Sequence, residues 1–248
     1  MCKDAFETQR QDFLFYCLFG ITKTEADCEI DKHKLAFYAC IDRAYRDLSR
    51  TVKYVETVSS LDEMKKRDPE KRKSFIKLKD DFKDKIKEII VEYIFGGTEK
   101  IQVKNKISSE PEQFDDWHKE LCDKIVNASK SDDFKMLFEK EDDSSSYLSY
   151  GQAQKWVNMT LKYMVIMGLL NFDEYKECLH VPIDRYILRE ILGGGEKYNG
   201  KAWSQINYEE YKEIRKKIDS EKGTQTAIEW ESIVWLKQAK EENENKNK

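Results

Sequence analysis

The sequence predicts an all-α fold, a compact domain built from roughly nine helices. Only 3 Pro and 10 Gly occur in 248 residues. A chain so poor in both residues usually consists of long helices, because β sandwiches and barrels need many more turns. Hydrophobic residues make up 40% of the chain, which is enough to form a core, and the 37% of charged residues predict a highly charged surface.

Hydrophobic residues recur at three- and four-residue intervals through the first half of the chain, which predicts amphipathic helices. Asp68 and Pro69 predict the start of one helix, with Asp68 as its cap, and Gly96 predicts its end. Polar residues 98–112 and 139–146 are expected to form loops. The predicted helices cover residues 6–21, 34–58, 69–95 and 114–128, with a short apolar segment at 134–138.

The second half of the chain contains a helix that is apolar on every side, from Lys155 to Gly168, which predicts a position at the centre of the fold. The next helix is expected to start at Asp184. Glycines 193–195 form a break, and Asn207 with Glu210 makes a capping box. Two further helices are therefore predicted, from this box to residue 218 and over residues 226–239.

These elements are expected to form a single helical domain over residues 1–240. An alternative treats residues 62–146 as an inserted lobe, because the acidic and serine-rich segment 139–146 separates them from the rest. The polar residues 241–248 are expected to fray as a C-terminal tail.

The six cysteines and the first residues predict a protein of a reducing compartment. No two cysteines have the spacing of a zinc or iron–sulfur site, and several lie in apolar helical segments, so we expect buried free thiols and no metal. The chain starts without a signal-peptide pattern, and its longest apolar run of about seven residues is far below the roughly 20 of a membrane helix. We therefore expect a cytoplasmic protein without membrane contact.

The net charge of −4 argues against a dedicated nucleic-acid-binding protein, although a local basic face could still bind one. The densest basic stretch, residues 65–79, is followed by interleaved acidic residues and is interpreted as a solvated helix face. Likewise, Arg43, Arg46 and Arg50 are interpreted as partners of neighbouring aspartates on their own helix.

The candidate chemistry lies between residues 149 and 192. Lys155 is expected in the first turn of the central helix, where the positive helix end and apolar surroundings favour the neutral amine that a nucleophile requires. Asp184 is expected to cap the next helix, where free backbone amides favour the ionised carboxylate. Two such helix starts can bring the amine and the carboxylate face to face.

The residues before these two helices are Ser149-Tyr150-Gly151-Gln152-Ala153-Gln154-Lys155 and Val181-Pro182-Ile183-Asp184. This pattern resembles the helix-hairpin-helix DNA glycosylase superfamily, which includes endonuclease III and the 8-oxoguanine glycosylases. The hairpin of that superfamily typically reads Leu-Pro-Gly-Val-Gly-x-Lys, followed by a helix and then Val-Pro-Val-Asp or Val-Asp. Ala153 replaces the second hairpin glycine, and the four-cysteine cluster of endonuclease III is absent.

The resemblance implies a DNA N-glycosylase that flips a damaged or modified base out of the duplex, with no cofactor. Lys155 would attack the sugar carbon as the base leaves and form a Schiff base, after which strand cleavage can follow. Asp184 would stabilise the positive charge that develops on the sugar. The candidate residues for binding the base or the phosphates are Tyr150, Gly151, Gln152, Gln154, Trp156, His180, Arg185 and Trp203.

Two other interpretations remain open. In the first, the protein is a non-catalytic helical binding or interaction protein in which Lys155 and Asp184 are only helix-start residues. In the second, it keeps the fold, has lost the chemistry and binds a nucleotide or modified base. A pocket shared by the two side chains is the arrangement expected of a catalytic protein.

Overall fold

The computed structural model describes residues 2–27, 30–56, 58–96, 106–139 and 146–246. It confirms the all-α class, because 74% of the structure is helical. Within the described residues, the strands form one antiparallel hairpin, and each of its two strands has two residues. The eleven α-helices within these ranges exceed the nine expected, because short helices were not resolved from the sequence pattern.

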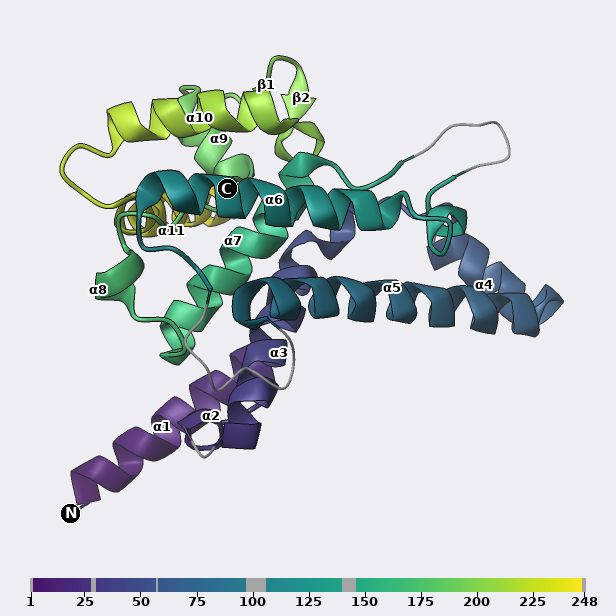
Figure 1. The fold of residues 1–248 in the computed structure, drawn as a ribbon, viewed down its shortest axis with the longest axis horizontal. Coiled ribbons are helices and arrows are strands. Elements are labelled where there is room, and N and C mark those ends of the chain that lie inside the picture. The colour runs from purple at the N-terminus through teal and green to yellow at the C-terminus, as the bar shows by residue number, and fades with distance from the viewer. Residues whose placement is uncertain (1, 28–29, 57, 97–105, 140–145, 247–248) are drawn as a thin grey trace.

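Helices follow one another along most of the described chain (Figure 1). In chain order they are α1 (Cys2–Phe19), α2 (Lys23–Asp27), α3 (Ile30–Leu48), η1 (Ser49–Thr51), α4 (Val58–Arg67), α5 (Pro69–Phe95), α6 (Pro111–Ser129), η3 (Lys135–Leu137), α7 (Tyr150–Met167), α8 (Phe172–Tyr175), α9 (Arg185–Ile191), β1 (Lys197–Tyr198), β2 (Lys201–Ala202), η4 (Trp203–Gln205), α10 (Tyr208–Glu221) and α11 (Ala227–Lys246).

Helix α7 lies at the centre of the fold, as the all-round apolar pattern predicts. Figure 1 shows it crossing the middle of the molecule, and it packs against α3, α6, α10 and η4. Ser149 caps its start in a box with Gln152, whose backbone N–H donates to the Ser149 hydroxyl at 3.1 Å. Gly168 ends it in the left-handed conformation, with φ 75°. Both ends of the helix are therefore fixed by local sequence.

Helix α5 begins and ends where the sequence predicts. The Asp68 side chain accepts a hydrogen bond from the Lys71 backbone N–H at 3.0 Å, and Pro69 occupies the first helical position. Gly96 follows the last turn with φ 80°, a conformation that costs glycine no steric strain. The 27-residue helix runs away from the centre and carries α4 near its far end (Figure 1).

One hydrophobic cluster joins the described parts of the chain. Phe82 of α5, Phe114 and Leu121 of α6, and Trp156 of α7 are all fully buried in it. Residues 62–146 therefore share their core with the rest of the fold.

The helix predicted over residues 34–58 ends earlier, at Leu48. Backbone groups beyond it bond to distant elements, because the Thr51 carbonyl accepts from Gln152 Nε2 at 2.6 Å and the Val55 N–H donates to Leu137 at 2.9 Å. These partners lie far away along the chain, so helical periodicity alone could not show that they would replace the helix.

Two smaller expectations need correction. The polar C-terminal residues are helical up to Lys246, because Glu242 accepts hydrogen bonds from Arg185 at 2.9 Å and from Lys246 at 2.6 Å. Cys17 is an exposed thiol, whereas Cys40, Cys122 and Cys178 are buried and free as expected. Cys28 lies outside the described residues, as does most of the loop predicted at 98–112.

Among the described helices, none combines the length and the apolar character needed to cross a membrane.

Candidate functional site

Lys155 and Asp184 meet as the sequence analysis expected. The Lys155 amine lies 2.9 Å from Oδ2 of Asp184, across 29 residues of sequence. Their side chains are 6% and 14% exposed, so the pair is largely buried but still reached by solvent. An ion pair in this setting is screened far less than one on the surface.

The backbone fixes the carboxylate of Asp184. Its Oδ1 accepts hydrogen bonds from the Tyr186 and Ile187 backbone N–H groups, at 2.9 and 3.2 Å, so Asp184 is the N-cap of α9. The preceding residue is held in turn by Gln154 of α7, whose side chain donates to the Ile183 carbonyl and accepts from the Ile183 N–H. One carboxylate oxygen thus caps a helix, and the other is left to face Lys155.

Lys155 is the sixth residue of α7, so it lies in the second turn and not in the first turn as predicted. The helix starts at Tyr150 because Ser149 and Gln152 form the capping box one turn earlier. At this position the amine reaches the carboxylate through its long side chain. Lys155, Met159 and Lys162 follow at intervals of four and three residues and line the same pocket, which makes them one face of α7.

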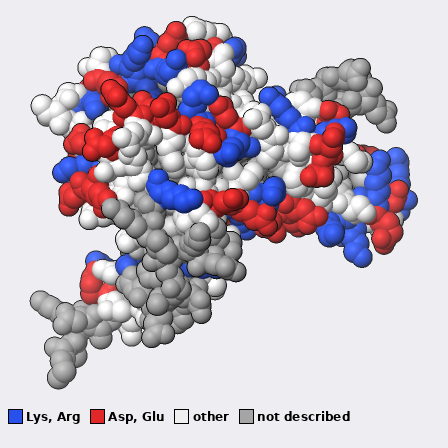
Figure 2. Space-filling view, viewed as in Figure 1, with Lys and Arg blue, Asp and Glu red and all other residues white. Residues whose placement is uncertain are grey.

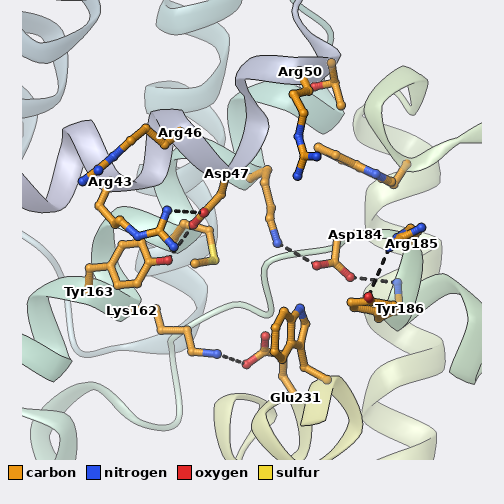
Figure 3. A pocket seen from close by; sticks show the side chains of 15 residues that line it. Arg43, Arg46, Asp47, Arg50, Lys162, Tyr163, Asp184, Arg185, Tyr186 and Glu231 are labelled. Atoms are coloured by element: carbon orange, nitrogen blue, oxygen red, sulfur yellow. Dashed lines mark hydrogen bonds and ion pairs between the residues drawn. The ribbon is translucent and has the colours of Figure 1, made fainter. Parts of the chain in front are cut away.

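The pocket beside this pair has a volume of about 840 Å³. Figure 3 shows the side chains that surround it, contributed by α3, α7, the start of α9 and α11. Cations outnumber carboxylates in its lining. The cations are Arg43, Arg46, Arg50, Lys155, Lys162 and Arg185, and the carboxylates are Asp47, Asp184 and Glu231.

The described outer face in Figure 2 looks different, because acidic and basic side chains are interspersed over it. The cationic excess of the pocket therefore sits within a chain of net charge −4. A cleft that is lined by charges of one sign concentrates counter-ions of the opposite sign. The pocket is consequently suited to an anionic ligand.

The two other carboxylates of the pocket also have partners within it. Asp47 pairs with Arg43 at 2.7 Å and accepts from the Tyr163 hydroxyl at 2.6 Å. Glu231, which is almost completely buried, pairs with Lys162. Each of the three carboxylates that line the pocket therefore forms an ion pair with a cation of the same lining (Figure 3).

Aromatic rings complete the pocket. Tyr186 and Trp235 pack edge to face, with ring centroids 5.5 Å apart, and Trp203 lines the wall from η4. Gly151 allows η4 to come this close, because a Cβ built on it would lie 2.0 Å from the Trp203 carbonyl oxygen. The Gly151 N–H also donates to Ile206 at 3.0 Å. Of the residues expected to bind substrate, Trp203 and Arg185 therefore line the pocket. Gly151 does not line it but allows η4, which carries Trp203, to pack closely against α7.

The remaining candidate binding residues do not line this pocket. Trp156 is fully buried, and its indole N–H donates to the Ile41 carbonyl at 3.2 Å. Gln152 caps α7, and Gln154 holds Ile183. Tyr150 and His180 are buried on another side of α7. These side chains support the position of the site but do not line its pocket.

His180 belongs to a hydrogen-bond network of largely buried side chains that ends at the partly exposed Asp115, and we call it the histidine network. Its Nδ1 lies 2.9 Å from the Tyr211 hydroxyl and its Nε2 lies 2.7 Å from Asp115. Asn158 of α7 donates to the same Tyr211 hydroxyl and lies 2.7 Å from Nε2 of His118. The network therefore ties α6, α7 and α10 together.

Burial lowers the pKa of His180 to about 4, although the hydrogen bond to Asp115 opposes the change. Burial also lowers the pKa of His118, with no carboxylate in direct contact to offset it. For Asp115, burial raises the pKa, but the hydrogen bond from His180 and the charge of Arg215 outweigh burial and hold it at about 2. Near neutral pH the two histidines are therefore uncharged.

The sequence analysis missed several residues of the pocket. Lys162 could have been found, because it lies seven residues after Lys155 and thus on the same helix face. Arg43, Arg46 and Arg50 were interpreted only as partners of nearby aspartates. Glu231 and Trp235 belong to an aromatic-rich stretch, residues 228–235, whose composition allowed a recognition pocket but favoured core packing, and the packing of α11 beside α9 brings them to the pocket.

Comparison with known proteins gives no match: no family model, no curated protein and no solved structure is significantly similar to this chain. Within the described residues, no group of three or more histidine, cysteine or acidic side chains could hold a metal ion. The chemistry of the site must therefore be argued from its amine, its carboxylates and the space beside them.

The arrangement has the parts needed for covalent chemistry at an electrophilic carbon. An amine and a carboxylate are in direct contact, so a proton can pass between them without a relay. The pocket offers room for a sugar and a base beside them, and its cations suit a phosphate.

Proposed function

We propose that the protein is a DNA N-glycosylase with an associated lyase activity, acting through Lys155 and Asp184. The single observation that carries the proposal is the 2.9 Å contact between these side chains at the edge of a cationic pocket of about 840 Å³. The resemblance of residues 149–192 to the helix-hairpin-helix glycosylases supports the same assignment. The aromatic wall of Trp203, Tyr186 and Trp235 supports a base as the ligand.

The proposed reaction begins when the bond between C1′ of the sugar and the base breaks. The electron pair leaves with the base, which takes up a proton from the Lys155 ammonium group through water, and positive charge develops on the sugar. Loss of this proton leaves Lys155 as the neutral amine. The ionised Asp184 stabilises this charge, as carboxylates do beside other oxocarbenium-like centres. Because the cap bonds hold Oδ1, the carboxylate needs little reorganisation as the charge forms.

Lys155 then forms a bond from its amine nitrogen to C1′ and gives a proton to Oδ2 of Asp184. The protonated Asp184 returns this proton to the ring oxygen O4′ as the C1′–O4′ bond breaks, and the nitrogen lone pair forms the C=N bond of the imine, the Schiff base. Asp184, ionised again, then takes a proton from C2′. The electron pair of that bond forms the C2′–C3′ double bond as the 3′ phosphate leaves, which breaks the strand. Each step uses only groups of the pocket, the substrate and water.

Trapping with borohydride tests this proposal. Wild-type protein is incubated with duplexes that carry abasic sites, oxidised bases or alkylated bases, and borohydride reduces any imine to a stable covalent adduct. We expect an adduct with at least the abasic duplex, and none with Lys155→Gln. Lys162→Gln is the matched control, because it removes the other lysine of the same helix face. Absence of an adduct across the whole panel would refute the proposal.

One observation favours the alternative of a non-catalytic binding protein. The charges of Lys155 and Asp184 neutralise each other at 2.9 Å, which a structural ion pair also does. In that case, Lys155→Gln would leave binding to abasic duplex unchanged and no adduct would form with either protein. The same trapping experiment therefore separates the two functions.

A further inference from the structure

Three arginines of the pocket have no carboxylate partner within its lining. Asp47, Asp184 and Glu231 are already bound to Arg43, Lys155 and Lys162. The cations that remain are Arg46, Arg50 and Arg185. Like charges around one cavity repel each other, and an anion that enters the cavity relieves this repulsion.

These three side chains differ in how they are held. Arg46 donates to the Leu18 carbonyl at 3.1 Å, and Arg185 pairs with Glu242, which lies outside the pocket lining, at 2.9 Å. Arg50 is exposed and makes no hydrogen bond or ion pair within the described part of the chain. Its side chain extends from η1 towards the space beside Lys155 and Asp184 (Figure 3).

We propose that Arg50 and Arg185 bind the phosphodiester backbone of the substrate strand on two sides of the pocket. This inference rests on the proposed function and adds the surface along which the strand lies. Guanidinium groups suit this role, because their planar N–H donors match the oxygens of a phosphate. Phosphate contacts of this kind fix the position of a strand and carry no sequence information, so the base is read elsewhere in the pocket.

The origin of these arginines agrees with such a role. Arg50 comes from η1 at the end of α3, and Arg185 is the first residue of α9, directly after Asp184. A strand bound by both would run along the pocket lining that also holds the carboxylate and the amine. A sugar of that strand would then come close to Lys155, as nucleophilic attack requires.

Binding measured against salt concentration tests the inference. The probe is a fluorescein-labelled duplex with a tetrahydrofuran abasic-site analogue, which binds without forming an imine. We expect Arg50→Gln to weaken binding about tenfold at low salt and to lower the slope of log K against log salt by about one. Arg185→Gln should act in the same direction.

Arg67→Gln is the matched control, because Arg67 is an exposed arginine on α4, away from the pocket lining. It should leave both affinity and slope at the wild-type values. Replacing the two phosphates that flank the analogue with neutral methylphosphonates should abolish the difference between wild type and Arg50→Gln. Equal slopes for wild type, Arg50→Gln and Arg67→Gln would overturn the inference.

The trapping experiment keeps this result separate from the proposed function. If adducts form and Arg50→Gln binds like the wild type, only the phosphate-binding surface is refuted. If the salt slope depends on Arg50 and no adduct forms on any duplex, only the glycosylase chemistry is refuted. If Arg50→Gln has the same thermal unfolding midpoint as the wild type, its binding defect does not come from unfolding.

Discussion

Two faces of α7 carry polar side chains in different surroundings: one face borders a pocket and the other lies in the protein interior. Lys155, Met159 and Lys162 face the pocket, where ion pairs border a cavity that solvent can enter. Gln154 and Asn158 face the interior, where every partner is a neutral group or a backbone carbonyl. The pocket side keeps charges that a ligand can compete for, whereas Gln154 and Asn158 bond to uncharged groups, and the charges of the histidine network lie on Asp115 of α6 and Arg215 of α10.

The comparison shows how one helix can support the core on one face and carry the charged side chains of a pocket on another. Buried neutral networks become rigid when all their members are satisfied. Gln154 bonds both backbone groups of Ile183, so the interior side of α7 positions the carboxylate of the next residue, Asp184. We therefore expect substitutions on the pocket side to change chemistry and substitutions on the interior side to change stability.

The largest effect is expected from Asp184→Asn. Asparagine caps a helix about as well as aspartate, so α9 should keep its start, but Lys155 loses its buried partner and the free energy of unfolding should fall by about 3 kcal/mol. The negative charge is lost, and the rate of adduct formation should fall about 10³-fold. Single-turnover trapping at a temperature where the variant is folded and thermal unfolding measure the two quantities. An unchanged rate of adduct formation by the folded variant would mean that Asp184 is only a cap and an ion-pair partner.

The next largest effect is expected from Gly151→Ala, behind the pocket. The added methyl would meet the Trp203 carbonyl at 2.0 Å, and backbone cannot yield as a flexible side chain can. We expect a loss of about 3 kcal/mol in the free energy of unfolding. Gly195→Ala is the control, because its nearest contact is Leu192 Cβ at 3.4 Å. Equal urea midpoints for the two variants would contradict the packing described for η4.

Stability should depend on pH through the histidine network. The pKa of His180 is about 4 in the folded protein and 6.5 when unperturbed, so the unfolded chain binds more protons between these values. The free energy of unfolding should therefore fall as pH drops from about 6.5 to 4, by up to about 3 kcal/mol.

Urea denaturation over this pH range measures the effect. His180→Gln should be less stable at neutral pH and should lose less stability on acidification than the wild type. His118 is buried as well, with its pKa lowered, so part of the dependence should remain. An unchanged pH dependence in His180→Gln would contradict a buried neutral imidazole.

The smallest effect is expected from Ser149→Ala, which removes the cap of α7. The Ser149 hydroxyl accepts from the Gln152 N–H and donates to the Ser204 carbonyl at 2.7 Å. We expect a loss of about 1 kcal/mol in the free energy of unfolding, measured by thermal denaturation. The adduct should still form, because Lys155 lies one turn further along the helix. Loss of the adduct without unfolding would show that the cap positions the amine.

The sequence was a good guide where local signals decide the structure. The cap at Asp68, the end at Gly96 and the all-round apolar character of α7 each depend on residues a few positions apart. The meeting of Lys155 with Asp184 was also expected, because both side chains lie near helix starts. The exact turn of Lys155 was not, since Ser149 and Gln152 form a capping box that places the start one turn earlier.

Long-range packing decided what the sequence could not predict. Tyr150, Trp156 and His180 have side chains suited to bind a base, but their partners on α3, α6 and α10 bury them. Glu231 and Trp235 reach the pocket only because α11 packs beside α9. A single sequence reveals the chemical type of such residues and not the direction in which the fold turns them.

Mapping the trapped adduct to a residue tests the central claim most directly. The borohydride-reduced complex with abasic duplex is digested and the modified lysine is identified by tandem mass spectrometry. The account predicts that the adduct is on Lys155. An adduct on Lys162, the other lysine of the same pocket, or on lysines outside the pocket would contradict it.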